Sequence, residues 1–478
     1  MAFITRPCSA RTPIQTPPPP FPDLDRDASE PIYRQLYWRF REAIANGLLR
    51  PGERVPAARA LARELGLARG TIDTAYSLLT CEGYLQARGQ AGTIVAPDIG
   101  TNPLPASRSP QASPAIRHTA QPLPFQLGLP ALDAFPKKLW AQIGARCVRS
   151  TCAQDMANPS AYGLQALRTA LASYLQVSRG ISCVPEQVFI TAGYQDSLAL
   201  ITHALLKPGD RVLIEDPGYP PTRQLLQHLQ IQTVALAVDH EGMRLPAAHT
   251  RAQAAVVTPA HQSPLCVSLS LPRRLELLAW ANRQQAWIIE DDYDGEYRYI
   301  SRPLPALKSL DREGRVIYSG TFSKVLFPGL RLAYVVVPQA RIERFEHASR
   351  NVRSSCPQLT QAIVASFMTQ GHFARHILRM RKLYGERRAF TRTGLQNVLG
   401  EHVRIDSSPG GMHLILRLGG QQSDVELARR MHKAGLFAEA LSEWSHLGEK
   451  PSGLLLGFAN IDSQASAEAL GRQILALM

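Results

Sequence analysis

The sequence lacks any apolar run of about 18 residues, the length that a membrane-spanning helix needs, so no transmembrane segment is predicted. Its seven cysteines are scattered and include no C-x-x-C pair. This spacing argues against a disulfide framework or a zinc site and favours a reducing cytoplasm. The Pro-rich N-terminus has no hydrophobic segment of the kind found in secretory signals, and no internal repeat is apparent.

The composition is rich in hydrophobic residues and in basic charge. With 478 residues and 45% hydrophobic content, the chain can bury more than one domain. The formal net charge is +14, which suggests a polyanionic partner but is weak evidence when taken alone.

Composition divides the chain into four stretches. Residues 1–28 are Pro-rich and are predicted to form a disordered tail. Residues 29–97 form a regularly patterned module, and residues 98–123 lack periodicity, as expected of a linker. Residues 124–478 alternate short apolar runs with amphipathic segments, which predicts an α/β domain with a mainly parallel sheet.

The module at 29–97 has the pattern of three helices and two strands. Ile32, Leu36, Phe40 and Ile44 recur every four residues and predict one face of a first helix. Two further helices follow, separated by a tight turn at Gly66, and "YLQARGQAGTIVAP" predicts two short strands around a second turn. This order is that of a winged helix-turn-helix, which lays the start of its third helix in the major groove of DNA.

The charge of the module agrees with DNA binding. Between residues 31 and 96 there are nine arginines and five acidic residues, so binding to phosphates should depend on salt. For charge alone, a solvated helix face is the commoner explanation. The ordered motif "L-x-P-G-E-R-x-P-x-x-R-x-L-A-x-E-L-G-x-x-R-x-T" is far more specific, and over the whole module it resembles the GntR family of bacterial transcription regulators.

That resemblance implies a set of DNA contacts. Arg59 on the second helix should contact phosphate, whereas Arg69 and Thr71, at the start of the third helix, should reach phosphate or base edges. Gly92 and Thr93 should lie in the wing.

The module also departs from the family pattern. Ala57 and Ala58 stand where the family usually has serine, which weakens the cap of the second helix. Asp73 adds a negative charge to the face that approaches DNA.

In the large domain, the most informative residue is Lys324, one of only eight lysines in the chain. It follows an apolar strand in "VIYSGTFSKVLFPGLRLAYVVV". A lysine at the end of a buried strand can lose its proton and form a Schiff base with an aldehyde, usually pyridoxal phosphate (PLP). Because a lone lysine is nearly always a surface residue, the prediction depends on finding the other groups that PLP requires.

Several segments would supply an anion site and a stacking ring. The strand–Gly–helix segment "FITAGYQDS" presents the amides of Tyr194 and Gln195 as a phosphate cradle. Tyr219, in a Pro-Gly turn after another strand, could stack on the pyridine ring.

The residues around Lys324 offer further phosphate ligands. Thr321 and Ser323 provide hydroxyls, and Arg331 provides a guanidinium.

The acidic segment "WIIEDDYDGEYRY" would supply the carboxylate. Strand alternation places Asp291 and Tyr293 on one face and Asp292 on the other. We therefore predict that Asp291 pairs with the pyridinium nitrogen and that Tyr293 donates to the ring hydroxyl. A metal site is the rival interpretation, but no histidine lies near in sequence, so none is predicted.

The order of these segments resembles that of the fold-type-I aminotransferases. "LKPGDRVLIEDPGYP", "IIEDDYDGEYRY" and "GTFSKVLFPGLRLAYVV" follow one another as expected. With the N-terminal module, residues 29–478 resemble the MocR-type subfamily of GntR regulators. The resemblance implies an aspartate-aminotransferase-like fold, PLP held as a Schiff base on Lys324, and a head-to-tail homodimer.

The departures from catalytic relatives decide between functions. Ser263 stands where an asparagine is common, and Asn460 stands where many aminotransferases have an arginine for the substrate carboxylate. Arg223 and Arg417 are the candidates to replace that arginine.

The leading hypothesis is a cytoplasmic, homodimeric regulator that binds a double-stranded DNA operator and senses PLP or an amino-acid or amine effector. The alternatives are an active aminotransferase with an accessory DNA-binding module and a PLP-free scaffold.

Overall fold

The computed structural model divides the chain into two compact units, Met1–His118 and Thr119–Met478. It describes residues 24–99, 122–157, 160–245, 250–299, 305–352, 356–406, 410–419, 422–448 and 451–478. Most of the predicted tail and linker lies outside the described residues. Among the described residues, no helix is long and apolar enough to cross a membrane.

The N-terminal unit has the predicted three helices and hairpin. These are α1 (Ile32–Ala45), α2 (Ala58–Glu64), α3 (Arg69–Cys81), β1 (Leu85–Ala87) and β2 (Thr93–Val95), with β1 and β2 antiparallel. The predicted face of α1 is confirmed, since Leu36, Phe40 and Ile44 are buried. They pack on Ile72 and Leu79 of α3 in one small core.

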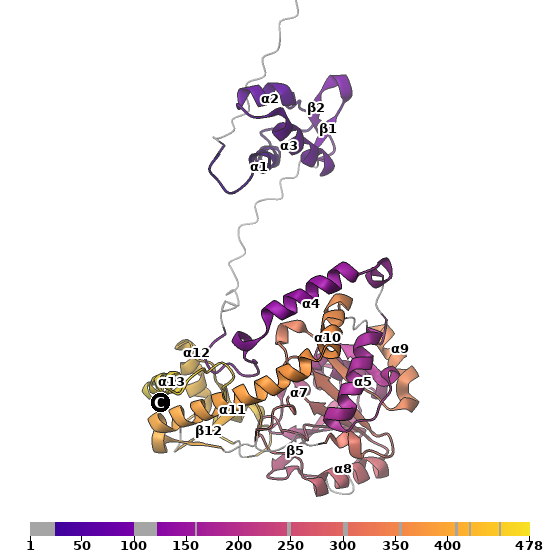
Figure 1. The fold of residues 1–478 in the computed structure, drawn as a ribbon, viewed down its shortest axis with the longest axis vertical. Helices are drawn as coiled ribbons and strands as arrows, with labels where there is room; N and C mark the ends of the chain where they lie inside the picture. Colours follow the sequence, from indigo (N-terminus) through magenta and orange to yellow (C-terminus); the bar gives the residue numbers. More distant parts are fainter. Residues whose placement is uncertain are drawn as a thin grey trace, which may run out of the picture. The chain divides into compact units, whose positions relative to one another are not determined.

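The larger unit is built on an eight-stranded sheet (Figure 1). Its strands are β3 (Val188–Thr191), β4 (Arg211–Asp216), β5 (Gln232–Asp239), β6 (Gly242–Met243), β7 (Ala254–Val257), β8 (Trp287–Asp292), β9 (Val316–Thr321) and β10 (Ala333–Val336). They lie in the order β3-β10-β9-β8-β7-β4-β5-β6. The five consecutive strands from β9 to β5 are parallel, so the predicted α/β fold with a mainly parallel sheet is confirmed.

Helices cover both faces of this sheet. The helices of the unit are α4 (Lys137–Ser150), α5 (Gln165–Arg179), α6 (Tyr194–Leu205), α7 (Pro220–His228), α8 (Leu271–Gln284), α9 (Ile342–Val352), α10 (Gln358–Thr369), α11 (His372–Leu399), α12 (Asp424–Lys433) and α13 (Gln464–Leu477). Along β4, Val212 and Ile214 pack with α6, whereas Leu213 packs with α8. This alternation buries both faces, as a parallel sheet requires.

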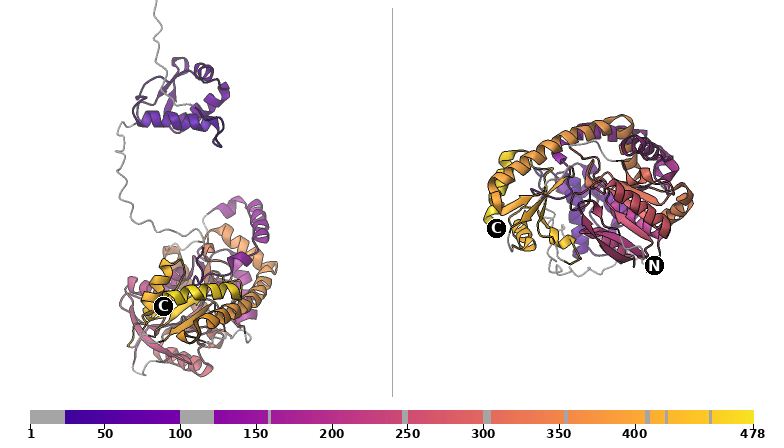
Figure 2. Two further views of the ribbon diagram at one scale, coloured as in Figure 1. Left: turned by 90° about the vertical axis from the view of Figure 1, so that its left-hand side faces the viewer. Right: turned by 90° about the horizontal axis from the view of Figure 1, so that it is seen from below.

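A smaller antiparallel sheet follows near the C-terminus. It consists of β11 (Val403–Ile405), β12 (His413–Leu418), β14 (Leu454–Gly457) and β13 (Glu439–Ala440), in that spatial order. The long helix α11 runs from α10 to the C-terminal helices and packs along α13 (Figures 1 and 2). This arrangement brings β12 close to the carboxyl ends of the parallel strands.

Candidate functional site

One cavity of about 290 Å³ lies at the carboxyl ends of the parallel strands. Ligands of open α/β sheets usually bind at this edge. All nine residues predicted to bind the cofactor line this cavity: Tyr194, Gln195, Tyr219, Asp291, Tyr293, Thr321, Ser323, Lys324 and Arg331. They come from the start of α6, from the ends of β8 and β9, from the segments after β4, β8 and β9, and, for Arg331, from the turn before β10. The individual role of each residue remains a prediction.

Lys324 presents its amine inside this cavity. Burial lowers the pKa of Lys324 below its usual value, although Asp294 and Asp291 partly oppose the effect. Lys324 Nζ donates a hydrogen bond of 2.9 Å to the carbonyl oxygen of Gly128. A Cβ at position 128 would lie 2.4 Å from that nitrogen, so any larger residue would displace the amine from this position. An amine that loses its proton readily is a good nucleophile.

Asp291 faces Lys324 as a buried carboxylate. Burial raises its pKa well above the usual value, and the neighbouring Asp292 raises it further. Among the residues that the structure describes, none donates a hydrogen bond to the Asp291 carboxylate. A buried acid without a donor is costly, and a pyridinium N–H would satisfy it.

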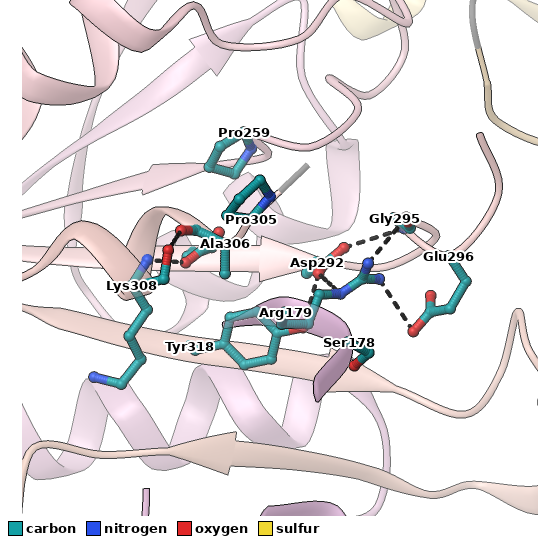
Figure 3. A network of polar contacts seen from close by, with 12 residues as sticks. Ser178, Arg179, Pro259, Asp292, Gly295, Glu296, Pro305, Ala306, Lys308 and Tyr318 are labelled. Carbon is teal, nitrogen blue, oxygen red and sulfur yellow. Dashed lines mark hydrogen bonds and ion pairs between the residues drawn. The ribbon is translucent and has the colours of Figure 1, made fainter. Parts of the chain in front are cut away.

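Asp292, by contrast, is held on the other face of the strand (Figure 3). Its Oδ2 atom lies 2.8 Å from Arg179 Nε and accepts a 2.7 Å hydrogen bond from the Tyr318 hydroxyl. Its Oδ1 atom accepts from the Gly295 amide at 3.1 Å, and Arg179 also pairs with Glu296 at 3.1 Å. This buried network fixes the end of β8 and keeps Asp292 out of the cavity, which Asp291 and Asp294 line.

An anion cradle lies beside Lys324. Arg331 has a left-handed backbone, with φ of +50°, and its guanidinium lies against Gly193 at the start of α6. A Cβ at position 193 would lie 3.1–3.3 Å from three guanidinium atoms. The positive end of α6 and the guanidinium therefore converge where a phosphate would sit, so the residues present fit PLP.

His261 belongs to the site, but the sequence analysis did not identify it. His261 Nδ1 lies 2.9 Å from the Tyr293 hydroxyl and 3.2 Å from Asp294 Oδ2. Burial lowers the pKa of His261, but Asp294 and Cys266 raise it, and the net shift is well above its usual value. When protonated, Nδ1 can donate to the Tyr293 oxygen, which leaves the Tyr293 proton free to donate into the cavity.

A thiol–imidazole pair lies behind His261. Cys266 Sγ is 3.2 Å from Nε2 of His413, a residue of β12 that lines the cavity. Burial raises the pKa of the Cys266 thiol, but His413 and His261 lower it, to about 6 overall. Cys266 and His413 are 147 positions apart in the sequence, which explains why no local motif predicted the contact.

The residues considered for a carboxylate clamp lie in different places. Arg417 is paired with Asp406, with 2.8 Å between Nε and Oδ2, and Asn460 donates to the carbonyl oxygen of Leu123. Neither residue lines the cavity. Arg223 lines a small adjoining cavity that shares Tyr219 with the first.

The predicted DNA contacts lie on the surface of the N-terminal unit. Arg59 and Arg69 are exposed on α2 and α3, and Thr71 is half-buried. Arg69 Nε lies 3.2 Å from Asp73 Oδ2, so the Asp73 charge competes with phosphate for this guanidinium. Gly92, with φ of +88°, leads into Thr93 at the start of β2.

Comparisons with known proteins agree with both parts of the molecule. The family model described as aminotransferase class I and II matches residues 143–472, and that of the bacterial regulatory proteins of the gntR family matches residues 32–95. Over 94% of each chain, the protein is 36% identical to the probable rhizopine catabolism regulatory protein MocR of Rhizobium meliloti. It is 32% identical to the pyridoxine biosynthesis transcriptional regulator PdxR of Corynebacterium glutamicum, covering 90% of this chain and 92% of PdxR.

Solved structures resemble the large domain. A kynurenine aminotransferase of Pyrococcus horikoshii aligns with a TM-score of 0.67 and 28% identity, over 75% of this chain and 92% of its own. LysN, an α-aminoadipate aminotransferase of Thermus thermophilus, aligns with the same score and identity over 74% and 92%. The chain thus belongs to the MocR-type subfamily of GntR transcription regulators, in which a winged helix-turn-helix is joined to an aminotransferase-like domain.

Proposed function

We propose that this protein regulates transcription by binding an operator through its N-terminal unit while its large domain binds PLP on Lys324 and senses an effector. The effector would be PLP itself or a small amine or amino acid. The observation that carries the proposal is the convergence of an amine, a buried carboxylate and an anion cradle in one cavity. A regulator of this kind would act in the cytoplasm, where bacterial DNA is found.

Each group has a distinct task in holding the cofactor. Lys324 Nζ would form the covalent bond, and Arg331 with the start of α6 would bind the phosphate, as their places in the cavity support. Asp291 would keep the ring nitrogen protonated, and Tyr293, which His261 contacts, would donate to the ring hydroxyl. When bound, PLP supplies an electrophilic carbon that can exchange the lysine for another amine. The two solved relatives support this assignment, because one was crystallised with PMP and the other with a phosphopyridoxyl-leucine.

DNA recognition would use the start of α3. Arg69 and Thr71 reach the major groove, while Arg59 and the wing at Gly92 and Thr93 contact the backbone. A homodimer would present two such helices to repeated or inverted half-sites. The effector can change DNA affinity only if it binds one conformer of the protein better than another.

A gel-shift titration of the full chain against the region upstream of its own gene, with and without PLP, tests the proposal. We expect a salt-sensitive complex whose affinity changes with PLP or an added amine, and Arg69→Ala should abolish it. Failure of the parent protein to form any salt-sensitive complex would refute DNA regulation. Sustained amino-group transfer to a keto acid, undiminished after removal of residues 1–100, would favour the aminotransferase alternative instead.

A further inference from the structure

A groove of about 730 Å³ lies at the opposite end of the main sheet, where the parallel strands begin. Arg251 and Arg283 line it, together with Trp287 at the start of β8. Arg315 and Arg341 place their guanidinium carbons 5.3 and 5.2 Å from the centre of the Trp287 ring. Cation–π contacts of this kind allow two like charges to lie close together.

A fifth arginine extends this surface along the edge of the sheet. Arg211 begins β4 and shares hydrogen bonds with Gln253, which lines the groove. Arg315, Trp287, Gln253 and Arg211 therefore mark the starts of four neighbouring strands, β9, β8, β7 and β4. Three strand spacings make a row of about 14 Å. We call this surface the arginine groove: Arg211, Arg251, Arg283, Arg315 and Arg341 around Trp287.

The charge of the arginine groove is not neutralised internally. Within the described part of the chain, no carboxylate forms an ion pair with any of its five arginines, and no interaction of theirs is left unaccounted for. Arg179, Arg273, Arg387 and Arg417 of the same domain are paired. Other exposed arginines, such as Arg375 and Arg472, also form no ion pair in the described part of the chain, but they do not line this groove. Five unpaired guanidiniums on one edge indicate a binding surface for a polyanion.

We propose that the arginine groove binds the phosphodiester backbone of duplex DNA, in addition to the contacts made by the winged helix. About 14 Å of duplex carries about four phosphates on each strand, so the charge along the groove is comparable with that of its five arginines. An acidic protein fits less well, because Trp287, the aromatic residue among the described lining residues, is covered by guanidiniums and offers no apolar anchor. The inference rests on the proposed DNA-binding function and assigns part of it to the large domain.

The location of the groove would connect DNA contact to the cofactor cavity. Trp287 and Asp291 lie four residues apart on β8, one at each end of the strand. The separation is about 13 Å. One strand therefore joins the edge that would meet DNA to the edge that would meet PLP.

Salt dependence of binding provides the test. A variant with Arg211→Gln, Arg251→Gln and Arg283→Gln removes three charges. It retains Arg315 and Arg341, which contact the Trp287 ring. A matched control with Arg375→Gln, Arg379→Gln and Arg472→Gln removes three exposed arginines elsewhere in the domain. The probe is a labelled duplex of roughly 60 base pairs from the upstream region. Full-length protein is titrated into it at several salt concentrations between about 50 and 200 mM. Circular dichroism confirms that both variants fold.

Each phosphate contact contributes about 0.9 to the slope of log K against log salt. We expect the slope of the groove variant to fall by about 2 to 3, and that of the control to stay at the parental value. Equal slopes in groove variant, control and parent would overturn the inference while leaving the proposed function intact. If the parent itself bound no DNA, the proposed function would fail instead. Groove-dependent binding of poly-glutamate but not of duplex would overturn the DNA assignment in favour of an acidic protein.

Discussion

The two units of this protein place their functional charges in opposite ways. In the N-terminal unit, Arg59 and Arg69 stand exposed on short helices, and their contacts within the protein are few. In the large domain, Asp291 and His261 are buried and Lys324 is half-buried, and desolvation together with neighbouring charges shifts the pKa of each. The exposed residues suit binding to a charged polymer such as DNA, which releases its counterions when arginines bind its phosphates. The buried residues suit chemistry on a small molecule.

Substitutions of charged residues should affect the stability of the two units differently. The fixed geometry around Asp291 depends on buried ion pairs that cost much to break, while the geometry of α2 and α3 depends on a small apolar core. Substitutions at the buried set should therefore damage folding or cofactor binding. Those at the exposed set should change DNA affinity and leave folding almost intact.

Replacing Lys324 is the most severe way to test the buried set. In Lys324→Ala, borohydride reduction followed by peptide mapping should find no PLP label, because Lys324 supplies the amine that lines the cavity among the residues described. Lys308→Met is the matched control, since burial also lowers the pKa of Lys308 (Figure 3). Its Nζ atom donates to the carbonyl oxygen of Val316 instead. That variant should still be labelled at Lys324. A label on any other lysine in the parent would refute the assignment.

Breaking the buried ion pair should come next in size. Arg179→Met leaves Asp292 and Glu296 without their buried cation and should lower the free energy of unfolding of the large domain by about 3–5 kcal/mol. Denaturant titration with separate probes for the two units measures the change. The exposed pair offers the contrast: Asp73→Asn should leave the unfolding of the N-terminal unit unchanged and tighten DNA binding. Equal losses of unfolding free energy in Arg179→Met and Asp73→Asn would contradict the expected difference between buried and exposed ion pairs.

The pH dependence of stability isolates a buried carboxyl that no cofactor role uses. Burial raises the pKa of Glu215 to about 7, against a usual value near 4.5. The folded state thus holds a proton that the unfolded state releases, so this group lowers stability as pH rises from about 4.5 to 7. Glu215→Gln should relieve up to about 3 kcal/mol at pH 8 and almost nothing below pH 4.5. Melting temperatures of the variant and the parent are compared at pH 8 and below pH 4.5. If Glu215 were already ionised at its ordinary pKa in the folded protein, the difference between variant and parent would be the same at both pH values.

A missing helix cap gives the smallest expected effect. Ala57 is the N-cap of α2 and makes no side-chain hydrogen bond to the helix. Ala57→Ser supplies an acceptor for a free amide and should stabilise the N-terminal unit by about 1 kcal/mol. Thermal unfolding of that unit measures the gain, with Ala60→Ser inside the helix as the control. A stabilisation equal in both variants would exclude capping as its cause.

The extent to which the sequence predicted the molecule differs between local and distant contacts. Helix faces in the N-terminal unit and the parallel sheet follow from periodicity, and both are confirmed. The cavity residues were predictable because each directly follows or precedes an apolar strand, and the carboxyl ends of parallel strands meet at one edge.

His261, His413 and Cys266 were not predicted, because their chemistry depends on a contact between two sheets. His413 reaches the cavity from β12, and the His261 ring packs where a side chain at Gly411 would lie, 2.0 Å from its nearest atom. No spacing within one element encodes such a contact. The His-Gln pair in "AHQSPL" was the only local signal, and it indicates neither the partner nor the protonation state.

The hydrogen bond between Lys324 and Gly128 has a mechanical consequence. Gly128 lies five residues beyond residue 123, where the chain leaves the predicted linker and enters the large domain. If Lys324 Nζ were bonded to a cofactor carbon it would keep fewer N–H donors, and the carbonyl of Gly128 would lose this hydrogen bond. The first part of the chain to respond would be the segment around Gly128, where the large domain begins.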